Sequence, residues 1–183
     1  MIDARNHLVG DTLRNGMAVT IRAIRREDKN KLLRAFKNLD RESVYTRFFH
    51  HVSELTDQDL RRATEIDFDR EVALVVTTML GNEEIIIGAG RYLAYEAADS
   101  KRSAEVAFTV EEDYQGLGIA GRVLKHLVQI ARQKDVSRFE ATVLAANQSM
   151  LRVFAASGLA MEQRRDGTVV EVTLFLDQTA ARG

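Results

Sequence analysis

The chain has 183 residues, of which 45% are hydrophobic and 29% charged, as in a soluble globular domain with one substantial core. Its net charge of −1 excludes an overall basic field that would attract nucleic acid or an anionic membrane. It contains no cysteine, which excludes disulfides, thiolate nucleophiles and thiolate metal sites. The start of the chain has no apolar signal segment, and no run approaches the roughly 18 apolar residues of a membrane span. We therefore expect a cytoplasmic protein.

The first half of the chain predicts a hairpin, three helices and two strands. Asn15-Gly16 is typical of a type I′ turn and predicts a hairpin over 12–24. Apolar spacing and capping residues predict helices over 26–39 and 41–49 and after Ser53 or Thr56. Nearly continuous apolar runs predict strands over 72–78 and 85–93, joined by a loop over 81–84.

The second half predicts alternating strands and helices followed by a closing hairpin. The expected elements are a strand over 104–110, a helix over 117–133, a strand over 139–144, a helix over 147–157 and a hairpin over 160–165 and 168–176. No linker or repeat is present. We expect a single domain over 1–183 of mixed α+β class, with its core over 17–176 and a polar tail over 177–183.

The stretch 105–126 suggests a phosphate site. An apolar strand passes through an acidic turn and the glycine-rich segment Q-G-L-G-I-A into an amphipathic helix. The first N–H groups of a helix have no intrahelical partners, and the helix dipole adds partial positive charge there. Glycine lets the backbone approach a ligand closely. This pattern favours an anionic, phosphate-bearing cofactor.

A dinucleotide site is one alternative, because Gly116, Gly118 and Gly121 also fit G-x-G-x-x-G. Glu140 lies near the distance at which that motif places its acidic residue. However, the dinucleotide fold requires the motif in its first βα turn. Here hairpins precede the motif, and too few residues follow it to complete a parallel sheet, so we favour another cofactor.

Three segments, in order, resemble the GCN5-related N-acetyltransferase (GNAT) family. Residues 115–120 resemble its Q/R-x-x-G-x-G/A signature, 104–110 its fourth strand, and 147–159 its N-x-x-A-x-x-L-Y-x-x-x-G-F segment. The resemblance covers roughly 18–176. It implies an α+β GNAT fold, with a mixed, mostly antiparallel twisted sheet of about seven strands and four to five flanking helices. It also implies acetyl-CoA as the acetyl donor and no metal.

The resemblance assigns a cofactor site. Free backbone groups of the fourth strand would hold the thioester arm at Phe108, Thr109 and Val110, and the following turn would bind pyrophosphate through Gln115, Gly116, Leu117, Gly118, Ile119, Ala120 and Gly121. Arg122 would reach a phosphate or lie on a solvated helix face. Asn147 and Phe154 complete the expected set. Phe154 stands where the family often has a tyrosine acid, so the leaving thiolate would be protonated by water or by the returning proton of the ammonium.

Glu105 is the candidate general base. An attacking lysine has an unperturbed pKa near 10.4 and must lose a proton before it can attack. Glu105 lies within an apolar strand, where burial would raise its pKa toward a working range, and family members place a catalytic glutamate on this strand. The alternative is a structural ion pair, for instance with Arg91.

The acceptor is suggested by one subgroup of the family. Residues 43–49, S-V-Y-T-R-F-F, are similar to bacterial protein lysine acetyltransferases of the Pat type, which modify acyl-CoA synthetases. This resemblance favours an acyl-CoA synthetase or another protein lysine as acceptor. A small-molecule amine and a non-catalytic acyl-CoA sensor stay open, as do core packing for Tyr45, Phe48 and Phe49 and a monomer or homodimer. Adjacent histidines such as His50 and His51 would point apart on either a helix or a strand, so we expect no metal there.

Overall fold

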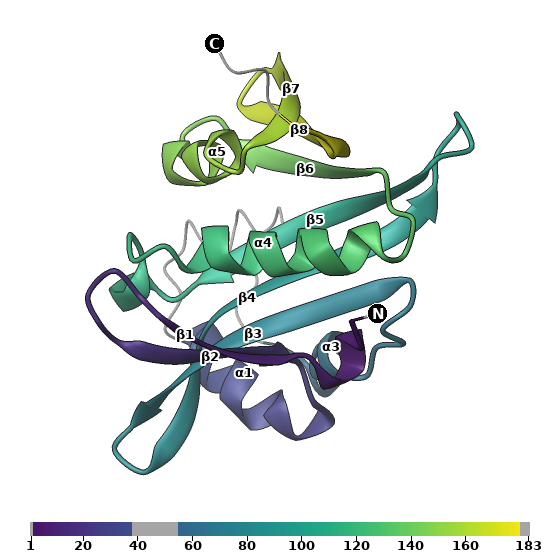
Figure 1. Ribbon diagram of the computed structural model, residues 1–183. Helices are drawn as coiled ribbons and strands as arrows, with labels where there is room; N and C mark the ends of the chain where they lie inside the picture. The colour runs from purple at the N-terminus through teal and green to yellow at the C-terminus, as the bar shows by residue number, and fades with distance from the viewer. Residues whose placement is uncertain (1, 38–54, 180–183) are drawn as a thin grey trace.

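An eight-stranded sheet organises the computed structural model, which describes residues 2–37 and 55–179 (Figure 1). The strand order is β1-β2-β3-β4-β5-β6-β8-β7. Every neighbouring pair is antiparallel except β5 and β6, which are parallel. The strands are β1 (Leu8–Thr12), β2 (Ala18–Ala23), β3 (Glu71–Leu80), β4 (Glu83–Glu96), β5 (Arg102–Val110), β6 (Arg138–Leu144), β7 (Leu159–Asp166) and β8 (Val169–Thr179).

Helices cover both faces of this sheet. The described α-helices are α1 (Lys29–Lys37), α3 (Asp57–Thr64), α4 (Ile119–Arg132) and α5 (Gln148–Ala155), and a 3-10 turn, η2 (Arg26–Asp28), precedes α1. The predicted apolar stripe of α4 is confirmed, because Val123, Leu124, Leu127, Val128 and Ile130 are all buried. Figure 1 shows α4 lying along the central strands, while α1 and α3 lie beside each other near β3.

Two glycines in β4 allow α4 to lie close to the sheet. A Cβ built on Gly88 would lie 2.7 Å from Ile119, and one on Gly90 would lie 2.5 Å from Val123 and 2.9 Å from Phe108. Any larger side chain would push the helix away, because packed interiors leave little free volume. These glycines therefore set the distance between the sheet and the helix that follows the glycine-rich turn.

Several predicted boundaries require correction. The first hairpin is present, but its first strand lies upstream at Leu8–Thr12, and a type I′ turn is wrong because only Gly16, and not Asn15, has positive φ. The loop between β3 and β4 is shorter than expected, since Glu83 and Glu84 already belong to β4. Thr56 caps α3 as predicted, and β8 continues into the expected tail as far as Thr179. The helix predicted over 41–49 lies outside the described residues.

A buried ion cluster joins β2, η2 and β4. The side chain of Arg22 is 2% exposed and that of Asp28 1%, and the guanidinium donates two hydrogen bonds of 2.8 Å to the Asp28 carboxylate. Arg22 also donates to Glu84 Oε1 at 2.8 Å. This cluster explains why β4 begins earlier than predicted. A buried guanidinium requires charged partners, and Glu84 reaches Arg22 from its position in the strand.

Candidate active site

The separation of β5 from β6 forms the centre of the site. These strands pair only at Ser103, Ala104 and Glu105, opposite Arg138, Phe139 and Glu140, after which β6 pairs only with β8 in the described sheet. Beyond Glu105, the edge of β5 that faces β6 therefore has no strand partner. Phe108, Thr109 and Val110 lie on this edge, where unpaired backbone groups can bind an extended ligand.

The predicted strand–turn–helix arrangement is present next to this edge. Gly116 and Gly118 have φ of 76° and 86°, a left-handed conformation that side chains with a Cβ disfavour. Gly118 is the N-cap of α4, so the N–H groups of the first helical turn lack intrahelical partners. Gln115 donates through Nε2 to the Val110 carbonyl at 3.3 Å, which ties the turn to the end of β5. The turn presents backbone donors suited to an anion.

Arg122 has partners that neither sequence expectation included. Its Nε lies 3.0 Å from Asp11 Oδ2, and its Nη2 donates to the Thr12 carbonyl at 2.8 Å. Its Nη1 donates to the Gly118 carbonyl at 3.2 Å. The side chain therefore clamps the β1–β2 hairpin against the glycine-rich turn.

Two further predicted residues lie on the other side of the strand gap. Phe154 of α5 is buried, and its ring meets the Phe108 ring edge-on with centroids 6.0 Å apart. Asn147 caps α5, because its Oδ1 accepts the Met150 N–H at 3.1 Å. The structure therefore brings Phe108 and Phe154 together, and gives Asn147 a capping role.

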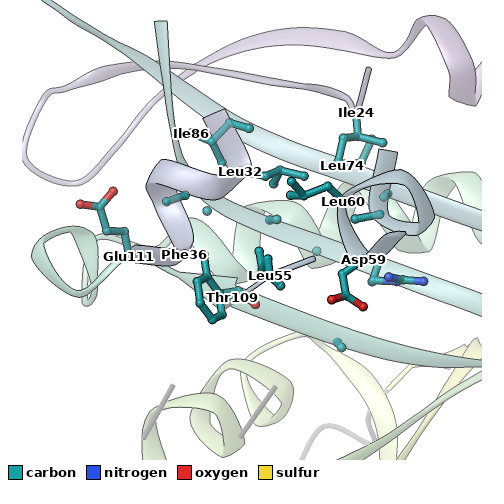
Figure 2. A pocket seen from close by; sticks show the side chains of 18 of the residues that line it. Ile24, Leu32, Phe36, Leu55, Asp59, Leu60, Leu74, Ile86, Thr109 and Glu111 are labelled. Atoms are coloured by element: carbon teal, nitrogen blue, oxygen red, sulfur yellow. The ribbon is translucent and has the colours of Figure 1, made fainter. Parts of the chain in front are cut away.

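A cleft opens on the face of the sheet that carries α1 and α3. It has a volume of about 380 Å³ and an apolar wall (Figure 2). Figure 2 shows the carboxylates of Asp59 and Glu111 at its borders. Gly88 also lines the cleft while lying close to Ile119, the first residue of α4, so the cleft and the glycine-rich turn share one region of the sheet. Its apolar lining includes Ile24, Leu32, Ala35, Leu55, Leu60, Leu74 and Ala107.

Glu105 lies on the same face of β5 as this cleft. Side chains alternate along a strand, so Glu105 points to the same face as Ala107 and Thr109, which line the cleft. The burial expected for Glu105 is wrong: its side chain is exposed, because the facing position in β4 is Leu93 at the sheet surface. The alternative interpretation was a structural ion pair of Glu105, for instance with Arg91. That pair is not formed, because Arg91 pairs with Glu71.

A second carboxylate stands beside Glu105. Glu140 is its register partner in β6, and it accepts hydrogen bonds from Arg138 Nε at 3.0 Å and from the Tyr95 hydroxyl. Burial and the hydrogen bond to Glu140 raise the pKa of Tyr95 to about 12. Glu140 is therefore held by hydrogen bonds to its neighbours, whereas Glu105 makes no ion pair with another described residue.

Arg14 lies at the candidate site, although the glycine-rich motif does not predict it. This residue is at the tip of the β1–β2 hairpin, and its Nη1 lies 3.4 Å from the Gly116 carbonyl. It is distant from the motif in sequence, and only the folded hairpin brings the two together.

Among the described residues no group of three or more potential ligands is placed to hold a metal, and no described helix could cross a membrane. The predictions for Tyr45, Phe48, Phe49, His50 and His51 concern residues outside the described ranges.

Comparison with known proteins supports the family resemblance. Residues 34–159 match the profile of the acetyltransferase (GNAT) family. The chain is 27% identical to acetyltransferase PA5475 of Pseudomonas aeruginosa, over 85% of this chain and 82% of that protein. It is 28% identical to acetyltransferase Pat of Mycolicibacterium smegmatis over 86% of this chain, but it spans only 46% of the length of Pat.

A solved structure extends the similarity to the whole fold. The GNAT domain of S. lividans PAT has 31% sequence identity to this chain and a TM-score of 0.81, covering 92% of this chain and 96% of that domain. The expected α+β architecture is thereby confirmed, and the described sheet has eight strands where the resemblance implied about seven.

Proposed function

The chain belongs to the acetyltransferase (GNAT) family, and from this premise we propose that it transfers an acetyl group from acetyl-CoA to a protein lysine, with Glu105 as general base. One observation carries the proposal. Glu105 is the last residue of β5 that pairs with β6, at the point where the strands separate, and it faces the same side as the apolar cleft. The unpaired edge, the cleft and a carboxylate therefore meet at one place.

The residues present fit acetyl-CoA. Left-handed glycines and the first turn of α4 provide N–H groups for the pyrophosphate, and the open edge of β5 provides backbone groups for the thioester arm at Phe108, Thr109 and Val110. When bound, acetyl-CoA supplies an activated carbonyl carbon and a thiolate leaving group. A backbone N–H of β5 directed at the carbonyl oxygen would stabilise the negative charge that develops there during attack.

Glu105 would remove the proton that prevents attack. A lysine ammonium has no free electron pair, so transfer of one proton to the Glu105 carboxylate yields the neutral amine. The amine nitrogen then bonds to the acetyl carbon as the carbon–sulfur bond breaks. The nitrogen, now acylated, loses its extra proton to give the amide, and the thiolate takes a proton from water or takes this released proton. Exposure of Glu105 suits this role, because bulk water can accept the proton that it collects.

The shape of the cleft supports lysine as the acceptor. A lysine side chain has an apolar stem and a charged tip, and it packs most favourably where apolar walls end beside a carboxylate or water. The cleft has apolar walls between α1, α3 and the sheet, with carboxylates at its border. The similarity to proteins named Pat supports the same choice.

The test replaces Glu105 with glutamine, which keeps the size and removes the base. We expect Glu105→Gln to lower kcat at pH 7 by about 100-fold or more, since a general base contributes about 10²–10⁴. The dissociation constant of acetyl-CoA should stay within about twofold. Activity of the variant should recover as the pH rises to 9, because more lysine is then already neutral. The measurement is thiol release with a lysine peptide, followed against pH.

The matched control is Glu140→Gln, one strand away in the same register. Glu140 is committed to Arg138 and Tyr95, so this variant should keep kcat within about threefold. Equal losses in the two variants, or no loss in Glu105→Gln, would remove Glu105 from the role of base. Thiol release only with small polyamines would instead replace the protein acceptor with a small-molecule amine.

A further inference from the structure

The glycine-rich turn lacks a cation of its own. Between Gln115 and Gly121 its side chains are amide, apolar or absent. Arg122 follows directly, but its charge is matched by Asp11 at 3.0 Å and its other donors are used by the Thr12 and Gly118 carbonyls. A pyrophosphate carries negative charge, for which backbone N–H groups provide only partial compensation. The positive charge at this site must therefore come from elsewhere in the chain.

The β1–β2 hairpin brings a second arginine to the turn. Leu13 is buried at the hairpin tip and anchors it, and the Arg14 N–H points to the Leu117 carbonyl at 3.5 Å. The clamp formed by Arg122, Asp11 and Thr12 holds the same hairpin. A Cβ on Gly118 would lie 3.4 Å from Arg14 Nε, so the guanidinium lies directly over the N-cap of α4.

The guanidinium of Arg14 is available for a stronger partner. It is exposed and makes no ion pair among the described residues, and its one side-chain hydrogen bond, to the Gly116 carbonyl, is long at 3.4 Å. Guanidinium groups bind phosphate through two parallel N–H···O bonds, which are shorter and stronger than a bond to a neutral carbonyl.

We propose that Arg14 binds the pyrophosphate of acetyl-CoA, with the β1–β2 hairpin acting as a third wall of the cofactor site. This inference rests on the proposed function, because it assumes that acetyl-CoA occupies the glycine-rich turn. It divides the work between two arginines: Arg122 fixes the hairpin to the turn, and Arg14 contacts the ligand. Arg14 is distant from the reacting atoms, so it affects binding and not the chemical step.

The experiment measures binding of three ligands by calorimetry: acetyl-CoA, its 3′-dephospho form, and acetyl-pantetheine, which lacks the pyrophosphate. We expect Arg14→Ala to weaken the first two about tenfold and equally, and to leave acetyl-pantetheine unchanged, because a hydrogen bond to a charged group contributes about this much. Arg14→Lys should recover part of the loss, since charge remains without the two-pronged geometry. The KM for acetyl-CoA should rise with kcat at saturation unchanged.

The matched control is Arg165→Ala. Arg165 is also exposed in a hairpin, and its Nε donates to the Gly167 carbonyl at 3.2 Å, far along the chain from the glycine-rich turn. It should leave all three affinities unchanged. Equal affinities for wild type and Arg14→Ala would overturn the inference. A loss confined to acetyl-CoA would move Arg14 to the 3′-phosphate and overturn the pyrophosphate assignment. Failure of wild type to bind acetyl-CoA would refute the proposed function itself.

Discussion

Two neighbouring glutamates on adjacent strands have different surroundings. Glu105 and Glu140 face each other in register, but only Glu140 accepts hydrogen bonds from Arg138 and Tyr95. Both carboxylate oxygens of Glu140 are occupied by these donors, so its side chain is held in place and is not free to turn toward an acceptor amine. This difference in hydrogen bonding separates a structural glutamate from a candidate base, although both lie in apolar strands of similar sequence.

The contribution of Glu84 to the stability of the fold should depend on pH. Hydrogen bonds from Arg22 and Lys31 lower the pKa of Glu84 from 4.5 to about 2, against the opposing effect of partial burial. A lowered folded-state pKa stabilises the fold above pH 4.5, and this contribution is lost as the pH falls from 4.5 toward 2. We expect Glu84→Gln to cost about 1–2 kcal/mol at pH 7, with the difference from wild type shrinking toward pH 2. Urea denaturation at several pH values measures it.

The adjacent Glu83 is a natural control. It pairs with Arg34, but both side chains are more than half exposed, so solvent screens the pair. Glu83→Gln should change the free energy of unfolding by less than about 0.5 kcal/mol at any pH. If the two variants titrated alike, the buried Arg22 cluster would not be the source of the lowered pKa.

Replacing glycine with alanine should have opposite effects on the free energy of unfolding at two positions near the start of α4. Gly118 has φ of 86° and the Arg122 guanidinium occupies the space of a Cβ, so Gly118→Ala should cost about 1–2 kcal/mol through backbone strain. Gly121 is helical, and a Cβ there would meet nothing within 4 Å. Gly121→Ala should therefore raise the free energy of unfolding by about 0.5–1 kcal/mol. Thermal unfolding without ligand gives both signs.

Measuring acetyl-CoA binding by the same two variants shows whether the glycine-rich turn also holds the ligand. Gly118→Ala should weaken binding as well as stability, because the turn that presents the N–H groups is distorted. A Gly118→Ala variant that bound acetyl-CoA as tightly as wild type would show that the left-handed turn does not hold the ligand.

Elements with a strong local pattern were predictable. The strand, glycine turn and helix over 105–126 and the cap of α5 at Asn147 follow from residues close in sequence, and all are present. The failures are non-local. The early start of β4 depends on Arg22, 62 residues before Glu84. The bounds of the edge strand β1 depend on its pairing with β2. Glu105 was expected to be buried because its strand is apolar, but exposure also depends on the strands placed beside it.

At the scale of the whole molecule, the site is assembled from distant parts of the chain. Figure 1 shows the amino-terminal β1–β2 hairpin reaching the same end of the sheet as the start of α4. The cleft adds α1 and α3 on the other face. The glycine motif could predict the glycine-rich turn, for which we propose pyrophosphate binding, since that turn is continuous in sequence. It could not predict Arg14 or the cleft, because both depend on the packing of segments about 30 to 100 residues apart.

We propose that this protein transfers an acetyl group from acetyl-CoA to a protein lysine. The most direct test is mass spectrometry of a folded acyl-CoA synthetase incubated with this protein and acetyl-CoA, with Glu105→Gln in parallel. We expect a mass increase of one acetyl group on a lysine of the synthetase, dependent on acetyl-CoA and nearly absent with the variant. Thiol release with no acetylated lysine, or equal acetylation with and without the protein, would contradict it.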